Sequence, residues 1–317
     1  MKRTTAACLA LVCSLGCSGE SLTQGLEEPI QIQGAQFRRG TLPGSLPADE
    51  PEAPRPTSLA SQGRTVEQGS SGISIVGRTT PDAESIAVLL HGGGGSGYWV
   101  LPVGTPEPQF NDEPTFGFSV AFGRELAGMQ RLRVAAIDAR GESGTQSELE
   151  ICVAPRVPDN LNACVPTIAP PELVVSLSWD RAADLDLVVV APSGKQVSPK
   201  DPSTVNLDEA GDPVPGETVG VFDLDSNAGC RGDGRRLENL VFQERPEPGR
   251  YLIYANLFDA CGEDSVRFSS VLYEKTRADA DDTYTVNRSL ETYGVLTRAQ
   301  ANAGTKLGTF VTQFQVR

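Results

Sequence analysis

Short apolar runs bounded by turn-forming residues recur along the chain from about residue 65 onward. In FGFSVAF (116–122) apolar and polar residues alternate strictly, which places the apolar side chains on one face of an extended strand. The runs SIAVLL (85–90), RLRVAAID (131–138) and ELEICV (148–153) also have the length and the flanking turn residues of strands. We therefore predict an antiparallel β-sandwich for this part of the chain.

The same pattern resumes after a proline-rich stretch at residues 166–171. LVVSLSW (173–179) alternates, and further apolar runs cover 185–191, 249–258, 266–274 and 308–316. No amphipathic pattern of three helical turns is present after the N-terminal segment. Both halves therefore indicate an all-β fold class. We predict two antiparallel β-sandwich domains, one at residues 65–168 and one at residues 171–317.

The first domain also resembles a known architecture. The hairpin predicted for LRVAAIDARGESG (132–144) and ELEICV (148–153) is similar to the last hairpin of immunoglobulin-like or fibronectin-III-like modules. This resemblance concerns topology, and it implies an immunoglobulin/fibronectin-III-like β-sandwich for residues 65–168.

The N-terminus has the pattern of an export signal. Two basic residues precede an apolar stretch at residues 6–15 that is too short to span a bilayer. Ser-Leu-Gly before Cys17 resembles a bacterial lipobox, with Ser14 where the pattern prefers leucine. We predict a lipoprotein signal peptide at residues 1–16 and a lipid on Cys17 that anchors the chain at the bacterial outer membrane or cell surface. Ordinary secretion is the alternative.

The segment that follows has a different composition. Residues 17–64 have few apolar residues and no sustained periodicity, and they include the acidic, proline-rich ADEPEAPRP (48–56). Such a composition does not support a packed core. We predict a flexible, disordered tether at residues 17–64 that holds the folded part away from the membrane.

The cysteine count supports export independently. Four cysteines remain after the predicted signal and lipid sites, namely Cys152, Cys164, Cys230 and Cys261. An even remainder is what an oxidising compartment requires. We predict that sequence neighbours pair, the first with the second and the third with the fourth, and that each bridge stabilises the fold by about 3 to 4 kcal/mol. No spacing is C-x-x-C, which disfavours a zinc or redox site.

The charge of the chain narrows the class of partner. The sequence has 27 basic and 41 acidic residues, a net charge of −14, which repels nucleic acid and anionic lipid surfaces. We therefore expect that the chain does not bind nucleic acid. We predict a non-catalytic binding or structural module whose partner is an unidentified protein or glycan. A carbohydrate-binding module is the alternative, although flat sugar platforms usually need more exposed aromatic rings than Trp99 and Trp179 provide.

The stretch LLHGGGGSGYW (89–99) contains two motifs that occur in enzymes. His-Gly-Gly-Gly is an oxyanion-hole signature of α/β-hydrolases, and Gly92, Gly94 and Gly97 fit the dinucleotide pattern G-x-G-x-x-G. The hydrolase needs a G-x-S-x-G elbow and a second histidine as base, whereas His91 is the only histidine of the chain. A β-like stretch follows where the dinucleotide site needs a helix. We predict a glycine-rich connector between two strands, and no enzyme.

One acidic constellation has the chemistry of a metal site. The two aspartates of DLDL (184–187) share one face at the end of a predicted strand, and a D-x-D-x-N pattern begins at residue 223. Oxygen ligands at these spacings suit Ca²⁺, a hard cation that takes about six to eight oxygens from a turning loop. We predict a Ca²⁺-stabilised acidic loop. Its candidate ligands are Asp184, Asp186, Asp223, Asp225, Asn227 and Asp233.

Two other interpretations of the same residues stay open. The loop is not an EF-hand, since Ala228 stands where glycine is needed and Gly234 where the bidentate glutamate belongs. The residues could be turn carboxylates that guard sheet edges. They could also form a carboxylate hydrolase, in which an aspartate of DLDL works beside Asp223 or Asp225 as an acid/base pair.

The residues around this constellation resemble a known family. DLDLVVVAPSGK (184–195), DLDSNAGCRGDGRRLENLVF (223–242) and PEPGRYLIYANLFDACG (246–262) are similar to motifs of the bacterial YfaP-type domain of unknown function. The resemblance covers about residues 171–275, and it implies an exported β-sandwich but no reaction. Val188 stands where many members have histidine. The second predicted disulfide would pin the acidic loop to a neighbouring strand and so favour a preformed ion site.

Overall fold

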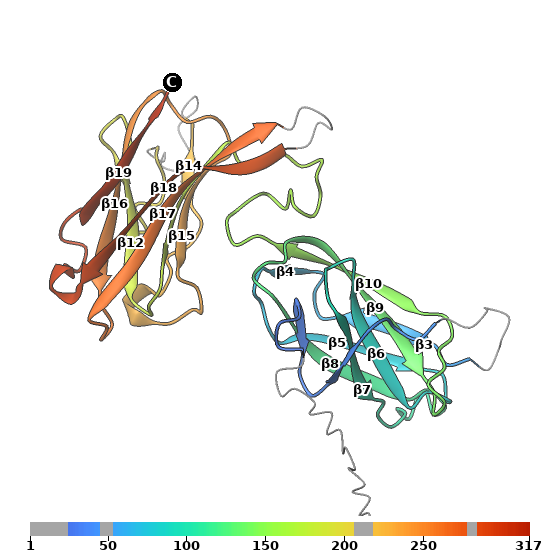
Figure 1. Cartoon of the computed structure of the whole chain (residues 1–317). Coiled ribbons are helices and arrows are strands. Elements are labelled where there is room, and N and C mark those ends of the chain that lie inside the picture. Colours follow the sequence, from blue (N-terminus) through green and yellow to red (C-terminus); the bar gives the residue numbers. More distant parts are fainter. Residues whose placement is uncertain (1–24, 45–52, 206–217, 278–283) are drawn as a thin grey trace, which may run out of the picture.

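The computed structural model describes residues 25–44, 53–205, 218–277 and 284–317. Figure 1 shows that these residues form packed β-sheets joined by loops. Strands account for 51% of the described residues, which confirms the all-β fold class. Within the described ranges the helical elements are two 3-10 turns, η1 (Ala228–Cys230) and η2 (Arg298–Gln300). None of the helices there is long and apolar enough to cross a membrane. The predicted signal peptide and Cys17 lie outside the described residues.

Strands β1 to β10 form two sheets, which we call the N-terminal sandwich. One sheet has the strand order β1-β8-β5-β3, and the other has the order β2-β7-β6-β9-β10-β4. The bounds are β1 Ile30–Ile32, β2 Gln36–Arg39, β3 Pro56–Ser61, β4 Thr65–Glu67, β5 Ile73–Thr79, β6 Ser85–His91, β7 Gly97–Pro102, β8 Thr115–Phe122, β9 Gly128–Ile137 and β10 Ser147–Ala154. The strands pair antiparallel except β4, which runs parallel to β10 and departs from the purely antiparallel prediction.

The core of the N-terminal sandwich follows the period-two pattern of its strands. Phe116, Phe118, Val120 and Phe122 of β8 all lie in one buried apolar cluster, as strict alternation predicts. The phenyl rings of Phe116 and Phe118 stack with their centroids 6.4 Å apart. Burial of these side chains is the main stabilising contribution that such a sheet makes.

The prediction of a disordered tether at residues 17–64 is wrong where the structure describes that segment. Three strands, β1, β2 and β3, lie inside it and join both sheets of the N-terminal sandwich. Ile30 and Ile32 are 2% and 4% exposed, because β1 adds to the edge of β8 and covers the core. Two apolar residues in a three-residue strand give no periodicity that a sequence window can detect. The order of this segment therefore depends on its pairing with β8.

Strands β11 to β19 form two further sheets, which we call the C-terminal sandwich. The five-stranded sheet has the order β14-β15-β11-β17-β18, and the four-stranded sheet has the order β13-β12-β16-β19. The bounds are β11 Leu173–Trp179, β12 Asp184–Val190, β13 Gln196–Val197, β14 Gly220–Phe222, β15 Leu237–Phe242, β16 Gly249–Asp259, β17 Ser265–Arg277, β18 Tyr284–Thr297 and β19 Thr309–Val316. All pairings of these strands are antiparallel.

The core of the C-terminal sandwich fixes the direction of the polar side chains on β12. Leu185, Leu187 and Val189 point into the buried cluster between the two sheets. Successive side chains of a strand point to opposite faces, so Asp184 and Asp186 point to the other face of the same sheet. The two aspartates therefore reach one site at the beginning of β12.

Both predicted disulfides are present. Cys152 is bonded to Cys164 at the end of β10, and Cys230 is bonded to Cys261, which joins the loop after β14 to the turn after β16. The glycine-rich stretch is a connector, as predicted. It joins the antiparallel strands β6 and β7, and two of its glycines, Gly92 and Gly94, have a φ of 76° that favours glycine over other residues.

Candidate metal centre

The first two ligands of the candidate site come from β12. Asp184 and Asp186 are 3% and 7% exposed, although they point away from the apolar core. Gly229 of the acidic loop contacts Asp184. The loop residues Lys200 and Thr305 lie around the cavity that Asp186 lines. The pairing of β12 with β16 shifts its register between Asp184 and Leu185. A β-bulge of this kind changes the direction of a side chain where strand pairing ends, here that of Asp184.

The third ligand comes from the loop that follows β14. Each of Asp184, Asp186 and Asp225 offers a carboxylate oxygen, and these three oxygens lie within 4.8 Å of one another. Asp225 is exposed, so the group opens to solvent on one side. Asp225 is 41 and 39 positions from Asp184 and Asp186 in the sequence, and the fold brings its carboxylate next to theirs.

The hydrogen bonds of the two buried aspartates differ. Oδ2 of Asp184 accepts a hydrogen bond of 2.7 Å from the backbone N–H of Gly229. Within the described residues, the carboxylate of Asp186 makes neither a hydrogen bond nor an ion pair. Lys200 is the nearby cation that acts on all three carboxylates, but it forms no ion pair with them within 4.0 Å; its ammonium lies 4.7 Å from the ring centroid of Phe258. A buried, unpartnered carboxylate is costly unless a cation or a proton compensates it.

The other three predicted ligands shape the loop and stay outside the group. Asp223 accepts hydrogen bonds from the backbone N–H and the side-chain amide of Asn239, at 2.9 and 2.7 Å. Asn227 is buried, and its backbone adopts the left-handed conformation with a φ of 60°. Its side-chain amide donates a hydrogen bond to the carbonyl of Ala183 at 3.3 Å. Asp233 accepts from the backbone N–H of Arg235 at 2.8 Å. These contacts are those of turn residues.

Glu238 belongs to the site, and the sequence interpretation missed it. This residue of β15 is fully buried. Its Oε2 accepts a hydrogen bond of 2.8 Å from the N–H of Leu187, and its Oε1 accepts one of 3.2 Å from the N–H of Ser226. It therefore ties β12 to the acidic loop. The signal was available, since Glu238 shares the core-facing alternation of Leu240 and Phe242 in LENLVF.

Burial dominates the electrostatics of the group. It raises the pKa of Asp184 to about 6 and, together with the charges of Asp184 and Asp225, raises the pKa of Asp186 to about 7. Burial also raises the pKa of Glu238 well above its ordinary range. Carboxylates with such pKa values favour either protonation or the binding of a cation near neutral pH.

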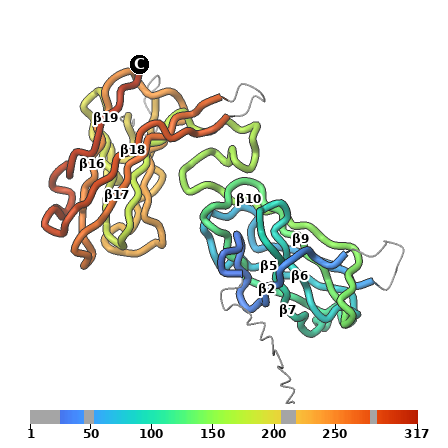
Figure 2. Tube along the Cα trace, viewed as in Figure 1, coloured from blue at the N-terminus to red at the C-terminus, as the bar shows by residue number. Residues whose placement is uncertain are grey.

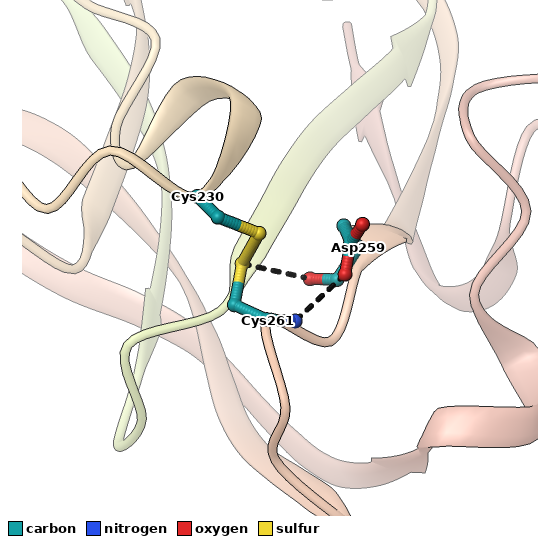
Figure 3. A group of neighbouring side chains, drawn as sticks. All are labelled: Cys230, Asp259 and Cys261. Atoms are coloured by element: carbon teal, nitrogen blue, oxygen red, sulfur yellow. Dashed lines mark hydrogen bonds between the residues drawn. A yellow bond between two sulfur atoms is a disulfide. The ribbon is translucent and has the colours of Figure 1, made fainter.

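A second group of potential ligands close by is not a metal centre. Cys230, Asp259 and Cys261 lie within ligand distance of one another, but Figure 3 shows the two sulfurs joined in a disulfide, which leaves no thiolate for a metal. The backbone N–H of Cys261 donates to Oδ1 of Asp259 at 2.7 Å. The contact of 3.6 Å between the Cys261 sulfur and the Asp259 carbonyl oxygen has no hydrogen to donate, since both sulfur valences are used. The group therefore acts as a structural turn.

Comparisons with known proteins give no family. No protein-family model matches the chain, and neither does any curated protein, so the YfaP-type resemblance is not confirmed. Solved structures that align with the chain include Rst D1-D2, with 11% identity, a TM-score of 0.22, and coverage of 75% of this chain and 97% of that one. Another is the C-terminal domain of the AgI/II polypeptide BspA of Streptococcus agalactiae, with 6% identity, a TM-score of 0.23, and coverage of 76% and 99%. No functional conclusion rests on likenesses of this size.

Proposed function

We propose that this chain is an exported, non-catalytic binding or structural module whose C-terminal sandwich is stabilised by a Ca²⁺ ion at Asp184, Asp186 and Asp225. The observation that carries the proposal is the carboxylate of Asp186, a residue that is 7% exposed and lines a cavity. This carboxylate accepts no hydrogen bond from the described residues and lies within 4.8 Å of two other carboxylates. Three converged carboxylates without a paired cation repel one another, and a divalent ion would remove that repulsion.

The donor set fits a hard cation. All three groups offer oxygen, which Ca²⁺ prefers, and none offers the sulfur or nitrogen that would favour zinc. The exposed side of the group at Asp225 leaves room for water to complete a coordination number of about six to eight. The bound ion would join β12 to the acidic loop, as the Glu238 hydrogen bonds do, while the Cys230–Cys261 disulfide fixes the same loop to the turn after β16.

Calcium binding is tested by thermal melts and isothermal titration calorimetry with CaCl₂ and with EDTA. We expect Ca²⁺ to raise the melting temperature of the wild-type chain and Asp186→Asn to abolish that shift. Asp82→Asn is the matched control, because it removes one exposed aspartate of the N-terminal sandwich and should leave the shift unchanged. A wild-type chain that melts at the same temperature in CaCl₂ and EDTA would refute the calcium site.

A carboxylate hydrolase is the second candidate, and one observation favours it. Asp186, with its pKa of about 7, lines a cavity of about 340 Å³ together with Lys200 and Asn256. A carboxyl group that is half protonated near neutral pH suits general acid catalysis. Hydrolysis of a glycoside in EDTA that is lost on Asp186→Asn would support this candidate, whereas calcium binding without hydrolysis would support the module.

We also propose that the chain is exported and held at a bacterial outer membrane or cell surface by a lipid on Cys17, and that it presents its sandwiches to a protein or glycan. The two disulfides support export, because such bonds persist in oxidising compartments. Membrane fractionation of Cys17→Ala tests the anchor. We expect the variant to leave the membrane fraction, and unchanged retention would contradict the lipid.

A further inference from the structure

The C-terminal sandwich has a long strand with a free edge. β18 is the last strand of the five-stranded sheet, where it pairs with β17 on one side only, and no described strand pairs with its other edge. It has 14 residues, against about 5 to 6 for a common strand. Figures 1 and 2 show that the β17–β18 hairpin projects beyond the body of the sandwich. A free edge of this length offers backbone N–H and C=O groups to another strand.

The edge of β18 is protected only by one β-bulge and two charged residues. The strand, YTVNRSLETYGVLT, contains neither lysine nor proline, and its charged residues are Arg288 and Glu291. Tyr293 and Val295 are 81% and 56% exposed. Exposed apolar side chains beside unpaired backbone groups are the features that natural edges avoid unless a partner covers them.

A β-bulge decides which side chains of β18 share a face. Leu272 of β17 pairs with Leu290, but the next residue, Tyr273, pairs with Arg288, so Ser289 is an extra residue. Leu290 packs against the core, and Glu291 therefore points to the outer face. Tyr273 follows Leu272 and points outward too, which places Arg288 on that same outer face.

The bulge consequently gives both halves of β18 one outer face. Its side chains are Tyr284, Val286, Arg288, Glu291, Tyr293 and Val295. In a regular strand, Arg288 and Glu291 would point to opposite faces, because they are three positions apart. The order along this face is apolar, apolar, positive, negative, apolar, apolar. A second copy that runs antiparallel therefore places a negative residue opposite the positive one and apolar residues opposite apolar ones.

We propose that two copies of this chain pair antiparallel through the free edges of β18, about a two-fold axis between Ser289 and Leu290. Arg288 then lies opposite the partner's Glu291, and Glu291 opposite the partner's Arg288. The same register places Val286 opposite the partner's Tyr293 and Tyr284 opposite the partner's Val295. Both copies carry the extra residue at the axis, so the ladder stays in register on both sides of it.

This pairing would extend the five-stranded sheet of one copy into that of the other. Within one chain the guanidinium of Arg288 already lies 3.0 Å from the carboxylate of Glu291. In the dimer, Arg288 of each copy would pair with Glu291 of the other copy, and these ion pairs select the register. The backbone hydrogen bonds between the two strands and the apolar side-chain pairs stabilise the association. The inference does not depend on the cation site, because β18 and β12 belong to different sheets.

Charge reversal tests the register. The molar mass of the exported chain carrying Cys17→Ala, which cannot be lipidated, is measured across micromolar concentrations by analytical ultracentrifugation. We expect a concentration-dependent dimer, which Arg288→Glu or Glu291→Arg alone converts to a monomer. An equimolar mixture of the two variants should form a heterodimer, because both cross-strand charge pairs are then opposite in sign. The double variant should dimerise with itself.

Two further variants keep the test specific. Val295→Lys adds an edge-guarding charge at an exposed position, and we expect a folded monomer. Arg131→Glu disrupts the exposed ion pair with Glu150 in the N-terminal sandwich, and we expect it to leave the dimer unchanged. A wild-type chain that is monomeric at every concentration would overturn the proposal, and so would a dimer that survives Val295→Lys and both single charge reversals.

Discussion

The backbone N–H of Gly229 donates a hydrogen bond of 2.7 Å to Oδ2 of Asp184, and so joins the acidic loop to the first residue of β12. Gly229 directly precedes Cys230, whose disulfide to Cys261 fixes the same loop to the turn after β16. The disulfide thus holds the amide that orients one carboxylate of the candidate metal centre. A covalent constraint and a ligand-orienting hydrogen bond act on neighbouring residues.

Removing the disulfide tests this coupling. The bridge spans 31 residues, and closing a loop of that length stabilises the fold by about 3 to 4 kcal/mol. We expect Cys230→Ser with Cys261→Ser to lower the free energy of unfolding by about this amount and to weaken Ca²⁺ binding. The control replaces Cys152 and Cys164, which should cost stability without changing Ca²⁺ affinity. Equal Ca²⁺ affinity of both variants in calorimetry would show that the loop needs no disulfide.

The pH dependence of the calcium-free chain follows from the raised pKa values. Asp184 and Asp186 have pKa values of about 6 and about 7 in the fold, against the ordinary 3.8, because burial penalises their charged forms. The folded chain therefore binds protons that the unfolded chain has released, and ionisation of these groups costs stability as pH rises through 6 and 7. In EDTA we expect the contribution of these groups to the free energy of unfolding to fall from about pH 4, where the unfolded carboxyls ionise, and to level off above about pH 7, where both states are ionised.

The pH dependence of the free energy of unfolding of Asp186→Asn in EDTA shows how much of the effect comes from Asp186. An amide cannot ionise, so the variant should show a shallower fall with pH and should be more stable than the wild type in EDTA at pH 8, by about 1 to 3 kcal/mol. Urea titrations at several pH values measure both quantities. An identical slope for the variant and the wild type would mean that Asp186 does not titrate in this range.

The outcome of sequence reasoning differs between the strands and the site. Alternation in β8 and β11 predicted buried faces correctly, because period two is a local property of the chain. Convergence of Asp184, Asp186 and Asp225 depends on the packing of a loop onto a sheet, which spacing alone does not determine. The D-x-D-x-N pattern suggested three loop ligands, yet two of them hydrogen-bond to neighbouring segments: Asn227 donates to the Ala183 carbonyl before β12, and Asp223 accepts from Asn239 of β15.

Glu238 illustrates why a buried charge is hard to assign from sequence. Its position in an apolar strand indicates a core-facing side chain, but its hydrogen-bond donors, the amides of Leu187 and Ser226, belong to distant segments. The unpaired stretch of β12 needs an acceptor, and only the three-dimensional arrangement shows that β15 provides it. The local sequence pattern thus predicts the strand β15, whereas the role of Glu238 as an acceptor depends on contacts with segments that are distant in the sequence.

Replacement of Glu238 is expected to destabilise the C-terminal sandwich strongly. Glu238→Ala removes the acceptor of two buried N–H groups and leaves a cavity, which together should cost about 2 to 5 kcal/mol. Chemical denaturation measures the loss, and Glu244→Ala, at an exposed position beyond the same strand, is the control. A loss below about 1 kcal/mol would indicate that water replaces the carboxylate as acceptor.

The short strand β1 offers a test of the ordered segment that replaced the predicted tether. Ile32 is buried in the core of the N-terminal sandwich and pairs with Val120 of β8. Ile32→Ala removes apolar volume from a packed core, and we expect it to lower the free energy of unfolding by about 2 to 4 kcal/mol. Leu26→Ala is the matched control, because Leu26 is 69% exposed and should change stability by less than about 0.5 kcal/mol. Equal stability of the two variants in urea would mean that β1 contributes nothing to the core, and that residues before β3 act as a tether after all.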